Sequence, residues 1–102
     1  MEKKILRKLF GGFIQIHILH HASKEPIYGV WMMEELREHG YDISPGTLYP
    51  LLHSMEKNGL LTKEEKNVDG KIRKYYTTTN MGVSVLKEAR AKAYEMFKEI
   101  KD

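Results

Sequence analysis

A chain of 102 residues, 41% of them hydrophobic and 30% charged, has room for one modest hydrophobic core and predicts a single globular unit. It contains no cysteine, which excludes a disulfide framework, a thiolate nucleophile and a cysteine-based zinc site. The net charge of +3 is too small to identify a partner, and no run of about 18 apolar residues is present, so we expect a cytoplasmic protein without a membrane-spanning segment.

The first predicted element is a helix over residues 5–21, because apolar residues recur there at spacings of three and four. Gly11 and Gly12 near its middle are expected to loosen it. A further apolar stripe predicts a second helix over residues 28–39. Gly40 is suited to end this helix, because glycine readily adopts the left-handed conformation found after a helix C-terminus.

A third helix is predicted to begin at Pro45 and to end before Asn58 and Gly59. Ser44 is a favourable N-cap, and Pro45 fits the first helical position, where its missing N–H is not needed. The side chains expected to face the core are Leu48, Leu51, Leu52 and Met55. Because only a short turn separates the second and third helices, the pair has the outline of a helix-turn-helix.

The start and outward arc of this third helix form the first candidate functional surface. Its residues are Ser44, Gly46, Thr47, Tyr49, Pro50 and His53. Pro50 cannot bond to the carbonyl of Gly46, but both residues lie outward, where water or a partner can satisfy that carbonyl. The arc fits either a mildly kinked surface helix or a helix whose small side chains let it approach a DNA backbone closely.

The same arc limits how DNA could be read. Between Ser44 and Met55 there is no Arg, Lys, Asn or Gln, the side chains that best make bidentate contacts with bases. Thr47, Tyr49 and His53 offer single hydrogen bonds or stacking. If this helix reads DNA, we therefore expect a few short contacts together with DNA shape to supply the specificity.

Two strands, over residues 60–66 and 71–78, are predicted to form a hairpin that resembles a wing. The dipeptide Asp69-Gly70 lies between them and favours a type I′ turn. That turn pairs Lys66 with Arg73, an unfavourable contact between like charges. A DNA phosphate would relieve the repulsion, and extension of both side chains into solvent is the alternative. The wing residues expected at DNA are Lys66, Lys71, Arg73 and Lys74.

Thr79 is predicted to cap a last helix over residues 80–101. The candidate dimer interface on this helix is Leu86, Ala89, Ala93, Met96, Phe97 and Ile100, most of them at the spacing of a coiled-coil seam. This seam could pack against the chain's own first helix, but a core of three short helices has little surface to cover a helix of this length. We therefore expect a homodimer. Residues 1–79 would bind DNA and residues 80–102 would dimerise, within one structural unit.

Other side chains carry weaker signals. His17 and His21 lie four residues apart, a spacing that can chelate a metal, but without a third ligand in view we expect neither a metal nor another cofactor. Trp31 falls among the acidic residues of its helix, where another element could cover it or where it could line a ligand pocket. The sequence lacks nucleotide-binding glycine loops and the G-x-S-x-G and H-E-x-x-H motifs, so no enzymatic activity is expected.

Two segments carry the most specific pattern. One is YGVWMMEELREHGYDISPGTLYPLLHSMEKNGLL, from Tyr28 to Leu61, and the other is GKIRKYYTTTNMG, from Gly70 to Gly82. Both closely resemble the PadR family of bacterial and archaeal transcriptional regulators. That family has a Tyr-Gly pair at the start of the second helix and a Ser-x-Gly-Thr-Leu-Tyr-Pro-Leu-Leu recognition helix. The matching residues of the recognition helix are Ser44, Gly46, Thr47, Leu48, Tyr49, Pro50, Leu51 and Leu52.

The resemblance implies a winged helix-turn-helix fold, mainly α-helical with a small β-hairpin, followed by a C-terminal dimerisation helix. It also implies a homodimer that binds a palindromic operator in double-stranded DNA, usually as a repressor. The residues that it places at the DNA are Ser44, Thr47, Tyr49 and Pro50 on the helix and Arg73 and Lys74 on the wing. A single C-terminal helix is similar to the family's short subgroup.

Some members of that subgroup bind flat aromatic drugs between tryptophans of the last helix. This chain has no tryptophan there, and its candidate pocket residues are Trp31, Tyr94 and Phe97. Three functions follow as alternatives: a DNA-binding repressor released by a small-molecule effector, a small-molecule sensor that uses the dimer cavity, and a winged-helix module that binds proteins. We expect the first.

Overall fold

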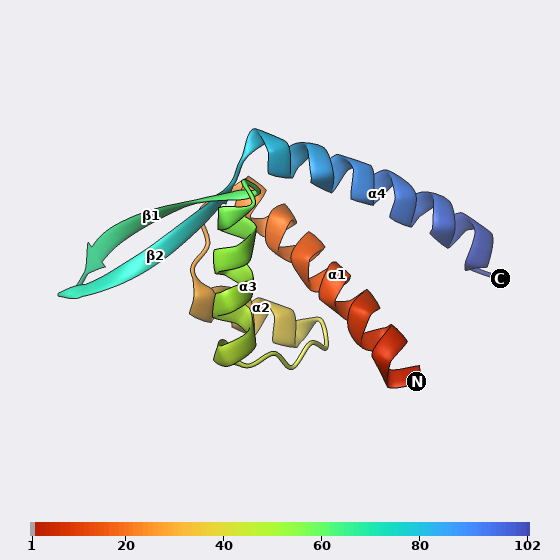
Figure 1. Ribbon diagram of the computed structural model, residues 1–102, viewed down its shortest axis with the longest axis horizontal. Helices are drawn as coiled ribbons and strands as arrows, with labels where there is room; N and C mark the ends of the chain where they lie inside the picture. Colours follow the sequence, from red (N-terminus) through yellow and green to blue (C-terminus); the bar gives the residue numbers. More distant parts are fainter. Residues whose placement is uncertain (1) are drawn as a thin grey trace.

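The computed structural model describes residues 2–102, which form four helices and a two-stranded antiparallel hairpin (Figure 1). The elements are α1 (Glu2–Lys24), α2 (Gly29–Glu38), α3 (Pro45–Lys57), β1 (Leu61–Val68), β2 (Lys71–Thr78) and α4 (Asn80–Ile100). The hairpin projects at one end of an elongated molecule, and the outer parts of α1 and α4 extend toward the other end (Figure 1). The predicted fold class, mainly helical with a wing and a C-terminal helix, is confirmed. No helix within residues 2–102 is long and apolar enough to cross a membrane.

The hydrophobic core lies where α1, α2, α3 and the start of α4 meet the base of the hairpin. Its residues are Ile18, Leu19, Ala22, Ile27, Met32, Leu36, Ile43, Leu48, Leu52, Met55, Leu61, Tyr76 and Leu86. Full burial of a large aliphatic side chain stabilises the fold by about 1.5–3 kcal/mol. This junction therefore fixes the position of α3 relative to the hairpin.

Helix α1 is longer than predicted, since it spans Glu2–Lys24 rather than residues 5–21. The expected loosening at Gly11 and Gly12 is wrong, because the helix is continuous through both. Each glycine disfavours a helix by about 1 kcal/mol relative to alanine. Extending an existing helix through two glycines nevertheless costs less free energy than ending it and nucleating a second helix, so α1 continues through Gly11 and Gly12.

Helix α3 begins at Pro45 as predicted, and Asn58 is its C-cap. Ser44 occupies the N-cap position, but its hydroxyl does not cap the helix: Ser44 Oγ donates a 3.3 Å hydrogen bond to Thr47 Oγ1 and binds no backbone N–H. The N–H of Thr47, one of those that an N-cap side chain would bind, donates to the Ser44 carbonyl at 3.0 Å instead. The first turn of α3 therefore has no side-chain cap.

The hairpin has the predicted turn and register. Asp69 and Gly70 have φ angles of 53° and 83°, the two positive values that a type I′ turn requires. Lys66 pairs with Arg73, as that turn dictates, and the ladder continues to Val68 beside the turn. At its base the hairpin is joined to the segment before α2, where Ile27 and Tyr76 exchange backbone hydrogen bonds of 2.9 and 2.7 Å.

Helix α4 starts at the predicted cap. Thr79 Oγ1 accepts a hydrogen bond from the Gly82 N–H at 3.0 Å and donates one to the Gly59 carbonyl at 2.6 Å. The neighbouring Thr78 Oγ1 donates to the Leu19 carbonyl at 2.8 Å. These bonds tie the end of β2 to α1 and to the end of α3, so α4 leaves the core in a fixed direction.

Candidate nucleic-acid interface

The outward face of α3 is exposed, whereas its opposite face is buried in the core. The exposed residues at its start and along its outward face are Ser44, Gly46, Thr47, Tyr49, Pro50 and His53. Leu48, Leu52 and Met55 are buried, and Leu51 is half-buried. Pro50 lies inside the helix without ending it. These exposed side chains are available to a partner without any rearrangement of the core.

The ring of Tyr49 packs against the backbone of Gly29, the first residue of α2. A Cβ added at Gly29 would lie 2.6 Å from both Cζ and Oη of Tyr49, so no other residue type fits there without moving the ring. Gly29 is buried, while Tyr49 remains 43% exposed. The contact accounts for a glycine at position 29, and it links α2 to α3 through residues that the sequence shows in two separate motifs.

Two basic side chains of the wing, Arg73 and Lys66, contact tyrosines. The Arg73 guanidinium lies 4.1 Å from the centre of the Tyr28 ring, and its Nη1 donates a 3.4 Å hydrogen bond to the Tyr75 hydroxyl. This hydrogen bond raises the pKa of Arg73 above its already high usual value. Lys66 Nζ lies 5.5 Å from the centre of the Tyr75 ring. Contacts with aromatic rings therefore reduce the repulsion between Lys66 and Arg73. From the sequence, only a DNA phosphate or extension of both side chains into solvent was expected to do so.

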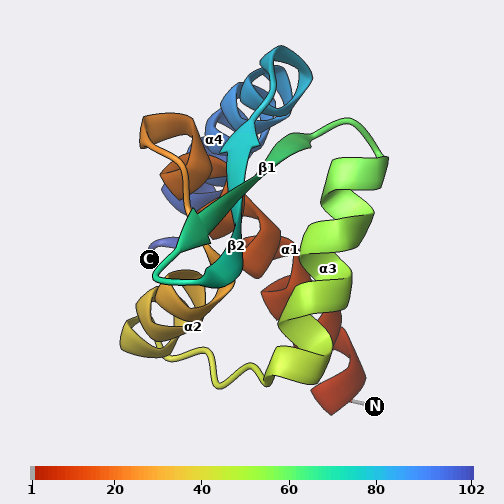
Figure 2. The ribbon, with the colours of Figure 1, turned by 90° about the vertical axis from the view of Figure 1, so that its left-hand side faces the viewer.

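A groove of about 690 Å³ lies between the wing, the start of α2 and Tyr49 of α3. Its lining combines Tyr28, Gly29 and Tyr49 with the wing residues Lys71, Arg73 and Lys74. Seen from the wing side, the hairpin, α2 and α3 all face the viewer (Figure 2). The structure thus brings Tyr49 and three predicted basic residues to one concave surface, while Lys66 and the start of α3 lie outside its lining.

The known proteins that this chain resembles agree with the geometry. The model of the transcriptional regulator PadR-like family matches residues 18–88, which run from α1 into α4 and include the whole of this surface. The chain belongs to the PadR-like family of transcriptional regulators. Its resemblance to that family, predicted from the recognition helix and the wing, is confirmed.

Individual PadR-like proteins match nearly the whole chain. It is 42% identical over 95 residues to the transcriptional regulator Rv3488 of Mycobacterium tuberculosis, a match that covers 93% of this chain and 89% of that protein. Its fold is similar to a PadR family transcriptional regulator from Eggerthella lenta, with a TM-score of 0.82 and 34% identity over 97% of this chain and 88% of that one. A PadR-like transcriptional regulator from Bacillus cereus gives a TM-score of 0.82 and 30% identity over 92% and 93%.

These matches establish the function at the level of the family. The chain is a short PadR-like protein with one C-terminal helix, and it is a DNA-binding transcriptional regulator rather than an enzyme. The winged helix-turn-helix assignment of α2, α3 and the hairpin is likewise confirmed.

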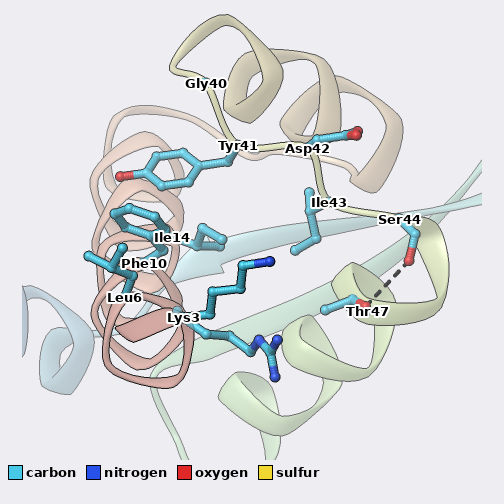
Figure 3. Close-up of a pocket in the computed structure, with 12 residues that line it drawn as sticks. Lys3, Leu6, Phe10, Ile14, Gly40, Tyr41, Asp42, Ile43, Ser44 and Thr47 are labelled. Carbon is cyan, nitrogen blue, oxygen red and sulfur yellow. Dashed lines mark hydrogen bonds between the residues drawn. The ribbon is translucent and has the colours of Figure 1, made fainter. Parts of the chain in front are cut away.

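A second groove, not predicted from the sequence, lies on the other side of α3 in this PadR-like fold (Figure 3). It has a volume of about 680 Å³ and lies between the N-terminal half of α1 and the turn from α2 to α3. Phe10 and Tyr41 meet edge to face there, with ring centres 5.9 Å apart, and Lys3 and Arg7 supply positive charge. Ser44 and Thr47 at the start of α3 line its far side, so the groove adjoins the candidate DNA surface.

The predicted ligand-pocket residues do not meet within the single chain. Trp31 is half-buried against α1, where its ring centre lies 5.4 Å from that of His21, as expected if another element covers it. Tyr94 and Phe97 are exposed on the outer half of α4. Trp31 lines a small groove together with residues 25–28, and neither Tyr94 nor Phe97 belongs to the lining of that groove.

The outer half of α4 presents apolar side chains to solvent. The predicted interface residues Ala93, Met96, Phe97 and Ile100 are all exposed, with Phe97 at 59% and Ile100 at 63%. Leu86, predicted as part of the same seam, packs in the chain's own core because the first turns of α4 lie on α1. Exposed apolar side chains also occur on the N-terminal half of α1, and these are Ile5, Leu6, Leu9 and Phe10.

Proposed function

We propose that this PadR-like regulator is a homodimeric repressor that binds a palindromic operator through α3 and the wing. The observation that carries the proposal is the groove in which Tyr49 of α3 meets Lys71, Arg73 and Lys74 of β2. A duplex that contacts α3 also meets these cations, because the core holds the hairpin and the helix in one fixed arrangement. Such a regulator works in the compartment that holds the chromosomal DNA, the cytoplasm.

The start of α3 is suited to a close approach to DNA. Its first turn has no side-chain cap, and its open backbone donor is the N–H of Gly46, because Pro45 has no N–H and the Thr47 N–H donates to the Ser44 carbonyl. A phosphate oxygen can accept from Gly46, and the helix dipole favours an anion at this end. The hydroxyls of Ser44 and Thr47 lie close by and can bind phosphate or a base edge. Gly46 has no side chain and Pro50 has a small one, so a DNA backbone can approach this face of α3 closely.

Sequence specificity would come from few contacts. The outward residues Thr47, Tyr49 and His53 each offer a single hydrogen bond or a ring to stack, and no side chain capable of bidentate base recognition lies between Ser44 and Met55. We therefore propose that groove shape and DNA deformability contribute strongly to operator choice. The wing cations would add affinity that falls with salt concentration.

The homodimer would form through the exposed apolar faces of α4 and α1. A helix that exposes Met96, Phe97 and Ile100 close together near its end buries them when it meets a second copy. A twofold dimer then presents two copies of α3, which matches the two half-sites of a palindrome. In this proposal the DNA contacts lie within residues 1–79, and residues 80–102 hold the dimer together with the exposed apolar face of α1.

Release by a small-molecule effector is a second proposal, and the groove of Figure 3 favours it. The groove has the size of a small-molecule site and an apolar floor that includes Phe10 and Tyr41. A ligand there would touch Ser44 and Thr47, which are also proposed to contact DNA. Saturable protection of the untagged protein against thermal unfolding by an aromatic ligand, lost in Phe10→Ala, would support it; a ligand panel without effect would contradict it.

Selection of binding sites from randomised duplexes at two salt concentrations tests the main proposal. We expect an enriched sequence with twofold symmetry and binding that weakens as salt rises. An asymmetric enriched site would contradict the dimeric part of the proposal. No enrichment at either salt concentration would contradict operator binding and would favour a sensor or a protein-binding module.

A further inference from the structure

Three histidines that are distant in sequence converge between α1 and α2. His17 and His21 lie one turn apart on α1, and His39 lies just after the end of α2. One ring nitrogen from each can be chosen so that all three atoms lie within 4.8 Å of one another. The rings of His17 and His39 are 4.5 Å apart, centre to centre. The sequence shows only the first pair; the third imidazole comes from the packing of the two helices.

A carboxylate lies beside two of the three histidines. Glu35 lies one turn before His39 on α2, and its Oε2 is 2.9 Å from Nε2 of His39 and 3.6 Å from Nε2 of His21. Two pairs of side chains, each four residues apart, thus face each other across the helix contact. A pair at this spacing can bind one ion from the same helix face.

We propose that His17, Glu35, His21 and His39 form a binding site for a divalent transition-metal ion such as Zn²⁺. Three imidazoles and one carboxylate form a four-ligand set that suits tetrahedral Zn²⁺. In such a site, metal bonds of 2.0–2.1 Å place neighbouring ligand atoms about 3.4 Å apart. The two Glu35 distances already bracket that value. The imidazole nitrogens have to approach one another by no more than about 1.5 Å, which side-chain rotation can provide.

His39 is exposed, so an ion can reach the cluster from solvent. His21 also contacts Trp31, the only tryptophan of the chain, and this ring is therefore a reporter of the site.

Titration of the untagged, metal-free protein with Co²⁺ tests the proposal without DNA. We expect saturation at one ion per chain, visible ligand-field absorption typical of tetrahedral Co²⁺, quenching of Trp31 fluorescence and reversal of both signals by Zn²⁺. His39→Ala and His17→Ala are each expected to weaken Co²⁺ binding at least about tenfold, and Glu35→Gln to weaken it similarly. His20→Ala, on the same helix, is the matched control and should bind Co²⁺ like the unchanged protein.

A second measurement keeps the test independent of folding defects in the half-buried His17 variant. Zn²⁺ at a large excess over its dissociation constant should raise the midpoint of thermal unfolding by about 5 °C or more. This shift should persist in His20→Ala and disappear in His39→Ala, whose exposed side chain can be removed without disturbing the core. The proposal is overturned if Co²⁺ shows no saturable binding, if the His20 and His39 variants lose binding equally, or if Glu35→Gln binds unchanged.

Discussion

The ring of Tyr49, on the outward side of α3, rests on the bare Cα of Gly29 at the start of α2. The two halves of the helix-turn-helix therefore meet through an exposed aromatic side chain as well as through the core. The orientation of a residue proposed to contact DNA depends on a glycine that does not itself need to touch the duplex.

Gly29→Ala should displace Tyr49 and weaken DNA binding. The added Cβ would lie 2.6 Å from the ring atom Cζ and from the hydroxyl oxygen Oη of Tyr49, so the ring has to move. We expect a loss of about 1–3 kcal/mol in the free energy of unfolding, measured by urea denaturation, together with a clear fall in affinity for the selected duplex. Gly12→Ala is the matched control, since a Cβ there meets nothing within 4 Å and should stabilise the helix by up to about 1 kcal/mol. Equal behaviour of the two variants would contradict the role of the Gly29 contact.

Gly82→Ala should destabilise the anchor of α4. The new Cβ would lie 2.6 Å from Cγ2 of Thr78 and would also overlap the carbonyl oxygen of Leu60, a backbone atom that cannot rotate away. We expect a loss of about 2–3 kcal/mol in the free energy of unfolding, because small-to-large changes in packed positions cost this much. Thermal unfolding monitored by circular dichroism measures this loss of stability. A midpoint equal to that of the unchanged protein would mean that Gly82 is not tightly packed against Thr78 and Leu60.

Tyr28→Leu should weaken DNA binding through Arg73. The guanidinium lies 4.1 Å from the Tyr28 ring centre, and loss of this support frees the side chain to adopt other rotamers. A contact of this type contributes about 0.5–1 kcal/mol, so affinity should fall roughly two- to fivefold. In an Arg73→Ala background the same change should have almost no further effect. A double-mutant cycle by fluorescence anisotropy measures this coupling, and additive losses would mean that Tyr28 contributes independently of Arg73.

Phe97→Glu should convert the dimer into a monomer. Phe97 is 59% exposed in the single chain and is proposed to be buried by the second copy, so a carboxylate there would be desolvated in the dimer. Sedimentation equilibrium should show a mass near one chain for Phe97→Glu and near two chains for the unchanged protein. Lys98→Glu, the neighbouring change, introduces the same carboxylate on the polar side of α4 and should remain dimeric. A monomeric unchanged protein would overturn the assignment of this face.

The features that the sequence predicts well depend on local chemistry. Asp69 and Gly70 determine the turn, and the turn determines which residues pair along the hairpin. The faces of α3 follow from the spacing of its leucines, and Thr79 caps α4 through atoms only three residues apart. The spacing of apolar residues, the type of a turn and the capping of a helix all depend on residues that are close together in the chain, so the sequence alone reveals them.

The features that the sequence misses depend on how elements pack. His39 meets His17 and His21 only because α2 packs against α1, and nothing in the spacing of the three indicates it. The contact between Gly29 and Tyr49 likewise crosses two helices. Leu86 has the spacing of a dimer seam yet lies in the core, because periodicity identifies an apolar face without identifying what covers it.

The central claim, that α3 and the wing bind one duplex together, is tested most directly by fluorescence anisotropy on the selected operator at several salt concentrations. The unchanged protein should bind with an affinity that falls steeply with salt. Tyr49→Ala should weaken binding at least about tenfold, and Arg73→Ala should both weaken it and reduce the logarithmic salt slope by about one for each wing bound. Lys87→Ala, an exposed change on α4, should leave affinity unchanged. Full affinity in both the Tyr49 and the Arg73 variants would contradict the claim.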